Sequence, residues 1–216
     1  MSPGYRSWTM PETPCAFSPV DRRVTQIFAL VSEALGTATH ALLHGELTTG
    51  QTVIDQDKVI DSLTNDLERI VWAQLDGEHL DGLGMRRLVG ILLILPELER
   101  SADLAEHIAQ RAVSNLGVDM SPLSRGIVQR MTEVALEMWG SVADSFVTRA
   151  PPAIALDEVD REIDILRDRL TAEVAAETMP TAVAAQVTLL ARFYERLGDH
   201  AVNLARRIAN LPPITP

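Results

Sequence analysis

Apolar side chains recur every three or four residues along most of this chain, and that spacing is typical of amphipathic α-helices. In the first such stretch, five apolar residues fall on one helical face: Val24, Ile27, Phe28, Val31 and Leu35. Short segments rich in glycine, proline or polar residues separate one stretch from the next. The pattern predicts six helices, over residues 21–47, 51–75, 85–113, 122–147, 156–177 and 181–210.

Two motifs occur twice, in the same order. The sequence ERSADLAEHIA begins at Glu99, and ERLGDHAVNLA begins 96 residues later at Glu195. Upstream of each lies a second motif, DKVIDSL from Asp57 and DREIDIL from Asp160. This long-range repetition indicates a duplicated unit rather than a short-period solenoid. Three helices per copy, joined by short connections, predict an all-α fold of two tandem, antiparallel three-helix bundles packed together.

The duplication predicts how the chain is divided. We expect a first three-helix repeat over residues 20–117 and a second over residues 118–210, with a flexible N-terminal tail over 1–19 and a C-terminal tail over 211–216. The two motifs are separated by 38 residues in the first half and by 31 in the second, counted from Asp61 to Glu99 and from Asp164 to Glu195. We expect the additional residues in the glycine-rich segment between the second and third helices.

Composition narrows the class of protein. A formal charge of −11 and a pI near 4.9 argue against nonspecific binding of nucleic acid, because contacts with phosphate groups need clustered Lys and Arg. The single cysteine, Cys15, cannot form an internal disulfide, which favours a reducing compartment. The longest apolar run, residues 88–95, is too short to span a bilayer. We therefore expect a soluble, cytoplasmic protein.

The repeated motifs carry carboxylates four residues apart, and this spacing puts both members of a pair on one helical face. In an antiparallel bundle, the pair on the second helix of each repeat faces the pair on the third. The two predicted clusters are Asp57, Asp61, Glu99 and Asp103, and Asp160, Asp164, Glu195 and Asp199. Converging carboxylates repel one another unless a cation or an arginine is present. All-oxygen ligands suit magnesium, calcium, manganese or iron, so the sequence predicts a metal-capable acidic face in each repeat.

Two alternatives remain open at this point. The acids could instead form ordinary salt bridges along solvated helix faces, with Arg100, Arg161, Arg167 and Arg196 as partners. His107 stands where the second copy has Asn203. It could add an imidazole ligand to the first site, or it could be a core histidine whose nitrogens are satisfied locally.

Catalytic motifs are missing from the sequence. A carboxylate-bridged di-iron enzyme needs Glu-x-x-His on two helices, and none of the five histidines follows a glutamate at that spacing. The sequence contains no Gly-x-Ser-x-Gly elbow and no P-loop. We therefore expect a protein that is not an enzyme. The alternative function is that of a metal-dependent helical-bundle enzyme or a metal-storage protein.

The acidic motifs resemble the signature of the PhoU family of phosphate-uptake regulators. That signature is an E(D)-x-x-x-D pair on one helix and an E-R-x-x-D-x-A pair on another. Residues 57–61 and 160–164 match the first pair, and residues 99–105 and 195–201 match the second. Residues 187–203 look especially similar to actinobacterial members. The first repeat departs from the family pattern, with Ser-Ala between Arg100 and Asp103 in place of the usual Ile-Gly.

The resemblance implies a fold of two three-helix repeats and a regulatory role. PhoU-like proteins link the ATPase of the phosphate ABC transporter to a sensor histidine kinase, and they keep phosphate-starvation genes off when phosphate is plentiful. The resemblance also implies iron or zinc on the acidic motifs, with manganese and magnesium as further candidates. It implies a homo-oligomer, such as a homodimer, that reaches the membrane through its partners.

Overall fold

The computed structural model describes residues 18–77, 80–176 and 179–212, and within these ranges it contains helices and no strand. The prediction of an all-α fold is confirmed. The helices are α1 (Pro19–His44), α2 (Leu47–Leu75), α3 (Gly82–Val113), α4 (Leu116–Asp119), α5 (Pro122–Thr148), α6 (Leu156–Ala176) and α7 (Thr181–Ala209).

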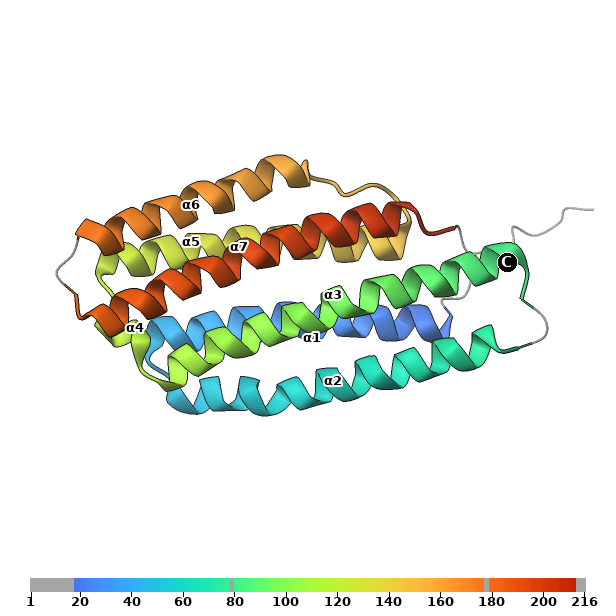
Figure 1. Ribbon diagram of the computed structural model, residues 1–216, viewed down its shortest axis with the longest axis horizontal. Coiled ribbons are helices and arrows are strands. Elements are labelled where there is room, and N and C mark those ends of the chain that lie inside the picture. Colours follow the sequence, from blue (N-terminus) through green and yellow to red (C-terminus); the bar gives the residue numbers. More distant parts are fainter. Residues whose placement is uncertain (1–17, 78–79, 177–178, 213–216) are drawn as a thin grey trace, which may run out of the picture.

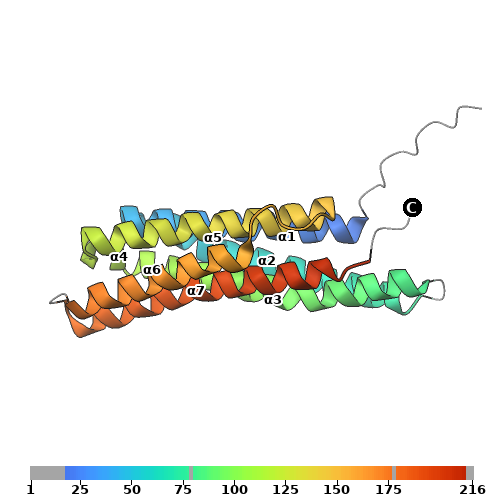
Figure 2. The same ribbon diagram turned by 90° about the horizontal axis from the view of Figure 1, so that it is seen from above.

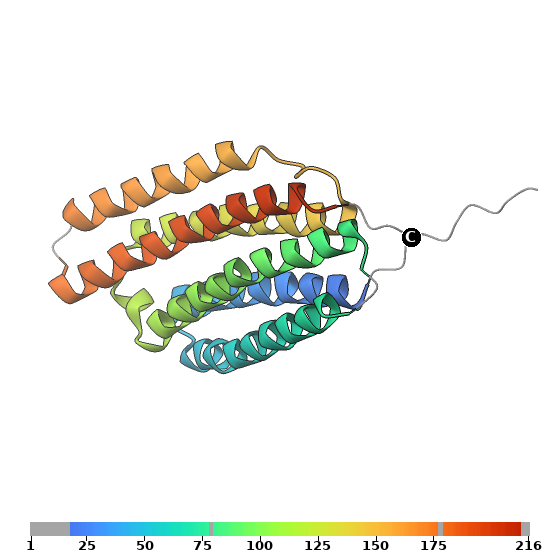
Figure 3. The same ribbon diagram turned by 45° about the vertical axis from the view of Figure 1, so that its right-hand side comes forward.

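The long helices form two three-helix bundles that lie side by side. Helices α1, α2 and α3 form the first bundle, and α5, α6 and α7 form the second. The bundles join where α1 packs on α5 and α3 packs on α7, so that these pairs form two layers (Figure 2). Helices α2 and α6 lie at opposite outer edges (Figure 3). The prediction of two tandem three-helix bundles is therefore confirmed.

Several helices begin or end at the serine, proline and glycine residues that separate the apolar stretches of the sequence. The Ser18 hydroxyl accepts a hydrogen bond from the Asp21 N–H, and Ser121 does the same for Ser124, so each serine caps a helix that begins with proline. Helix α1 ends earlier than predicted, because Gly45 adopts a left-handed conformation with φ of 69°. The short helix α4 lies between the repeats and has no counterpart among the predicted helices.

Polar contacts buried between helices fix how the bundles meet. Asp21 of α1 is fully buried and forms two ion pairs. One is with Arg87 of α3, and the other is with Arg149, which follows α5 and whose Nη2 lies 3.1 Å from Oδ1 of Asp21. At the α3/α7 contact, the Ser101 hydroxyl lies 2.8 Å from Nδ1 of His200. Because buried charges and hydroxyls need partners, these contacts favour one arrangement of the two repeats.

The two repeats differ in the length of their outer hairpins. Helices α2 and α3 contain 29 and 32 residues, whereas α6 and α7 contain 21 and 29. Much of the additional sequence of the first repeat therefore lengthens its helices, and not only the glycine-rich connection as we expected. Leu211, just beyond α7, lies against Gly90. The segment of α3 before Gly90 thus projects past the end of α7 (Figure 1).

No helix in the described ranges is both long and apolar enough to cross a membrane. The predicted tails fall mainly on residues 1–17 and 213–216, which lie outside the described residues. Pro19, which we placed in the N-terminal tail, is the first residue of α1. The boundaries of the two repeats, 20–117 and 118–210, stay predictions.

Candidate metal-binding faces

The first acidic face consists of Asp57 and Asp61 on α2 and Glu99 and Asp103 on α3. These antiparallel helices pack along each other, so the two pairs of acids meet across the groove between them. One carboxylate oxygen each from Asp57, Asp61 and Asp103 lies within 4.8 Å of the other two. Glu99 lies beside them, near enough to Asp61 and Asp103 to be perturbed by their charges.

Electrostatic strain is concentrated at Asp57. Burial, followed by the charges of Asp61, Glu106, Asp103 and Glu99, raises the pKa of this half-buried carboxyl to about 6. The pKa values of Glu99 and Asp103 are also raised, first by burial and then by the charge of Asp61. The protein therefore holds these carboxylates together at an electrostatic cost.

The donor set of the first acidic face fits a hard or borderline cation. Oδ1 of Asp57 is buried and has no hydrogen-bond partner among the described residues. It lies next to a cavity of about 160 Å³ that Glu106, Glu33 and Ala102 also line. Clustered carboxylate oxygens without arginine partners are the ligands that Mg²⁺, Mn²⁺ or iron ions take in proteins. Asp57, Asp61 and Asp103 could hold such an ion, with Glu99 beside them.

Glu106 is an acidic residue that the motif search missed. It faces Asp57 from α3 and contributes to the raised pKa of that carboxyl. Its position could have been inferred, because it follows Glu99 by seven residues and Asp103 by three, and therefore lies on the same side of the helix.

The second acidic face consists of Asp160 and Asp164 on α6 and Glu195 and Asp199 on α7. Burial raises the pKa of Asp160 to about 6, followed by the charges of Asp199, Asp164, Asp157 and Glu195, so the four predicted acids are again close together. The structure thus brings the predicted residues near one another in both repeats, and within the described residues the group with three ligand oxygens inside 4.8 Å is the one in the first repeat. Whether either group binds a metal stays a prediction.

Arginines neutralise part of the second acidic face. Nη1 of Arg167 lies 2.8 Å from Asp164 and 3.4 Å from Glu195, and Arg192 forms a further ion pair with Glu195. Arg167 is one of the salt-bridge partners considered from the sequence. Arg100, another of them, instead pairs with the buried Glu97 at 3.2 Å. The salt-bridge alternative therefore describes part of the second repeat better than the first.

A glycine makes room for Asp160 in the second acidic face. A Cβ atom at Gly198 would collide with Oδ1 of Asp160 and come within 3.1 Å of Ile163. The carboxylate therefore rests directly on the backbone of α7. Ala102 stands at the equivalent place in the first repeat and is buried.

His107 packs between the repeats. Its ring centroid lies 5.4 Å from that of Phe193 on α7, and Arg111 lies over the same phenyl ring at 4.9 Å. The imidazole still lies near enough to Asp103 for its charge to lower the pKa of that carboxyl in opposition to the larger effect of burial. Nδ1 of His107 is buried and has no hydrogen-bond partner among the described residues, so the interpretation as a core histidine with locally satisfied nitrogens does not fit its location.

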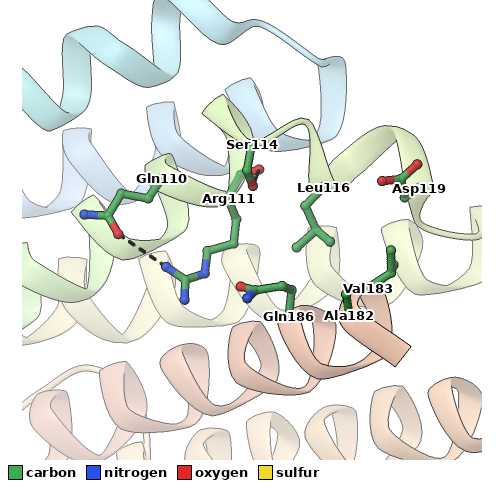
Figure 4. Close-up of a pocket in the computed structure, with 8 residues that line it drawn as sticks. All are labelled: Gln110, Arg111, Ser114, Leu116, Asp119, Ala182, Val183 and Gln186. Atoms are coloured by element: carbon green, nitrogen blue, oxygen red, sulfur yellow. Dashed lines mark hydrogen bonds between the residues drawn. The ribbon is translucent and has the colours of Figure 1, made fainter. Parts of the chain in front are cut away.

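A separate cavity lies where the two repeats meet, far along α3 from Glu99. It has a volume of about 380 Å³ and lies between the end of α3, α4 and the start of α7 (Figure 4). Arg111 lines it and donates a hydrogen bond to the Gln110 side chain at 3.4 Å. Asp119 lines the same cavity close to the start of α7. Its negative charge there complements the positive end of the α7 dipole.

The fold and the two faces define a class of protein, namely a duplicated three-helix bundle with paired carboxylates on the outer hairpin of each repeat. The family model described as "PhoU domain" matches residues 24–112 and again residues 128–208. The chain therefore belongs to the PhoU family, and the resemblance inferred from the acidic motifs is confirmed.

Curated relatives cover most of the chain. A protein from Rhizobium meliloti (strain 1021), named phosphate-specific transport system accessory protein PhoU homolog, is 28% identical over 193 residues, or 87% of this chain and 81% of that protein. The protein named PhoU homolog 2 from Mycobacterium tuberculosis is 29% identical over 195 residues, or 88% and 92% of the two chains.

Solved structures share the fold. The crystal structure of PhoU from Pseudomonas aeruginosa superposes with a TM-score of 0.82 at 21% identity and covers 89% of this chain and 94% of its own. PhoU from Streptococcus pneumoniae gives a TM-score of 0.77 at 19% identity, with 89% and 92% covered.

Proposed function

We propose that this protein is a regulator of phosphate uptake that works as an adaptor in the cytoplasm. It restrains phosphate transport and phosphate-starvation signalling by linking the ATPase of the phosphate ABC transporter to a sensor histidine kinase. Membership of the PhoU family carries this proposal, together with relatives named as accessory proteins of the phosphate-specific transport system. We infer that the protein acts by binding, because its sequence contains no Glu-x-x-His pair, Gly-x-Ser-x-Gly elbow or P-loop.

The same proposal assigns a cation to the acidic faces. The observation that supports it is the group formed by Asp57, Asp61 and Asp103, whose ligand oxygens lie within 4.8 Å of one another. A bound cation would remove the repulsion that raises the pKa values of these acids. It would also hold α2 and α3 together along their exposed groove, and so stabilise the surface that partners meet.

A genetic experiment tests the regulatory role. Deletion of the gene should leave a phosphate-starvation reporter switched on in phosphate-rich medium, and expression of the unchanged protein should switch it off again. Phosphate uptake by the deletion strain, measured with radiolabelled phosphate, should exceed that of the parent. A deletion strain with normal repression and normal uptake would contradict the proposal.

Metal binding is tested on the purified full-length protein after treatment with a chelator. Titration with Mn²⁺ or Fe²⁺ should give saturable binding, and the pair of changes Asp57→Asn and Asp103→Asn should weaken it at least about tenfold. The matched control makes the equivalent changes, Asp160→Asn and Asp199→Asn, and should have a smaller effect. Binding that survives all four changes would refute the assignment.

Two further measurements address what the family resemblance implies. Sedimentation equilibrium tests the predicted homo-oligomer. Assays of oxygen consumption and iron content test the alternative that the protein is a metal-dependent enzyme or a metal store, because either turnover of oxygen or accumulation of many iron atoms per chain would favour that alternative.

A further inference from the structure

The outer hairpin of the first repeat carries an exposed row of large apolar side chains, which we call the apolar strip. It consists of Trp72 on α2 and Met85, Val89 and Leu93 on α3, whose exposed fractions are 52%, 50%, 44% and 52%. The three α3 residues follow one another at four-residue spacing and therefore share a side of the helix. Large exposed apolar side chains that recur along one side of a helix mark an interaction site more often than isolated apolar residues do.

The apolar strip lies where neighbouring helices leave the hairpin uncovered. Leu211 and Pro212, which follow α7, contact Gly90 and Arg87 of α3, so Val89 lies beside the end of the second bundle and Met85 lies on the part of α3 that projects beyond it (Figure 1). The second repeat lacks an equivalent strip. Ala175, Thr181 and Ala185 stand at the positions of Trp72, Met85 and Val89, and only Leu189 repeats Leu93.

The Trp72 end of the apolar strip adjoins the first acidic face. The indole N–H of Trp72 donates a hydrogen bond to Glu68 at 3.2 Å, and the charge of Glu68 raises the pKa of Glu99. Two arginines near this boundary have partners of their own, since Arg69 pairs with Asp66 and Arg100 pairs with Glu97, whereas the exposed Arg86 adjoins Met85 on α3. One surface of α2 and α3 is therefore apolar at one end and acidic at the other.

We propose that this surface binds an amphipathic helix of a partner protein that carries apolar residues in one half and Lys or Arg in the other. The inference rests on the proposed adaptor function and identifies where a partner docks. From Met85 to Asp103 the surface spans nineteen residues of α3, or eighteen steps of 1.5 Å and roughly 27 Å, so a helix of about that length matches it. Basic residues of the partner would meet Glu68 and Glu99, which lie beside the proposed cation ligands Asp57, Asp61 and Asp103 and are not among them.

Charge complementarity selects this occupant over a second copy of the chain. The protein carries a formal charge of −11, and the surface itself is acidic, so a second copy would bring like charge to it. Anionic membranes are disfavoured for the same reason. An acidic partner helix would also be repelled, which gives the surface a means of selecting its partner.

The test uses a synthetic helical peptide as probe and the full-length protein. The peptide has eighteen residues, a leucine stripe in one half and four arginines at helical spacing in the other. Binding should shift the fluorescence of exposed Trp72, whereas Trp139 is fully buried and should not respond. In the variant Trp8→Phe, Trp72 is the exposed tryptophan that reports binding. The affinity should fall as salt rises, because charged groups contribute to it.

Matched variants locate the site. Leu93→Asp should weaken peptide binding at least about tenfold, whereas Leu189→Asp, at the equivalent and similarly exposed position of the second repeat, should change it less than about twofold. Glu68→Gln should weaken binding about threefold at low salt and reduce the salt dependence. Circular dichroism checks that each variant keeps its helices.

Several results would overturn the inference. One is that Leu93→Asp and Leu189→Asp weaken peptide binding equally. A second is that a peptide with glutamates in place of the arginines binds as tightly as the arginine peptide. A third is that the protein binds phosphatidylglycerol vesicles and not the peptide. Dimers that dissociate on Leu93→Asp would show a second copy as the occupant. If the Leu93→Asp protein restores full repression in the deletion strain, the docking surface is refuted and the proposed function stands. If the deletion itself has no phenotype, the proposed function is refuted.

Discussion

The two acidic faces are built from the same four positions, yet their surroundings differ. In the second repeat, Arg167 and Arg192 form ion pairs with Asp164 and Glu195. In the first repeat, Thr64 stands at the position of Arg167 and Pro96 at the position of Arg192. At both positions the first repeat therefore lacks the positive charge that lies beside the acids of the second repeat.

This comparison indicates what distinguishes a cation site from a salt-bridged surface. The spacing of the acids is the same in both repeats, so it cannot decide between the two outcomes. Residues one helical turn away determine whether the acids form salt bridges or a cation site. They either supply a guanidinium group or leave the carboxylates without a counter-ion. We therefore expect the first acidic face to bind cations more tightly than the second, although the second matches the family motif more closely.

The largest effect should come from exchanging these neighbours. Arg167→Thr with Arg192→Ala removes both guanidinium groups from the second acidic face, and should raise its cation affinity at least about tenfold because Asp164 and Glu195 lose their partners. Calorimetric titration with Mn²⁺ should then resolve a second binding event per chain. Titration curves that stay unchanged would mean that the arginines do not block the site.

The reverse exchange is a smaller change on the first repeat. Pro96→Arg introduces an arginine three residues before Glu99, as Arg192 precedes Glu195. It should weaken cation binding at the first acidic face about threefold, since an exposed i, i+3 ion pair is weak and only one counter-ion is supplied. The same titration measures it. Tighter binding in this variant would contradict the role given to the neighbouring charge.

Much of this comparison could be predicted from the sequence, because it depends on local periodicity. The i, i+4 spacing of Asp57 and Asp61 fixes their common face, and antiparallel packing of neighbouring helices brings Asp103 opposite them. Proline and serine at the start of α5 likewise mark the helix start to within a residue.

Other features could not be read from the sequence, for physical reasons. The four residues of α4 are too few to show a period. The partner of an arginine depends on helix rotation and side-chain rotamer, so spacing alone did not show that Arg100 turns to Glu97 while Arg167 bridges Asp164 and Glu195. The sequence points to the glycine-rich connection as the place of the additional residues in the first repeat, because an extension of a helix has no distinctive composition.

The response to pH should be similar in the two repeats. The pKa values of Asp57 and Asp160 are both raised to about 6, so each carboxyl binds its proton more tightly in the folded than in the unfolded chain. Each ionised carboxylate therefore destabilises the metal-free fold above about pH 6. This destabilisation is lost as the pH falls from about 6 toward the ordinary pKa of an aspartate, about 4.

Asparagine substitutions measure this effect. In metal-free protein near pH 7.5, Asp57→Asn and Asp160→Asn should each raise the free energy of unfolding by about 1 kcal/mol, a value reduced for solvent screening of half-exposed groups. The gain should shrink as the pH approaches about 4. Urea unfolding at several pH values tests this, and a gain that grows at low pH would contradict the sign.

The smallest effect should come from Gly198, the residue that lets Asp160 rest on α7. In Gly198→Ala, the higher helix propensity of alanine is worth about 1 kcal/mol, but the new methyl group must displace the Asp160 carboxylate and press on Ile163. These contributions should nearly cancel. Gly140→Ala in α5 is the matched control, because no side chain lies near its Cβ position and the full gain of about 1 kcal/mol is expected there. Equal gains in the two variants, measured by urea unfolding, would mean that Asp160 is free to move and that the glycine does not set the geometry of the second acidic face.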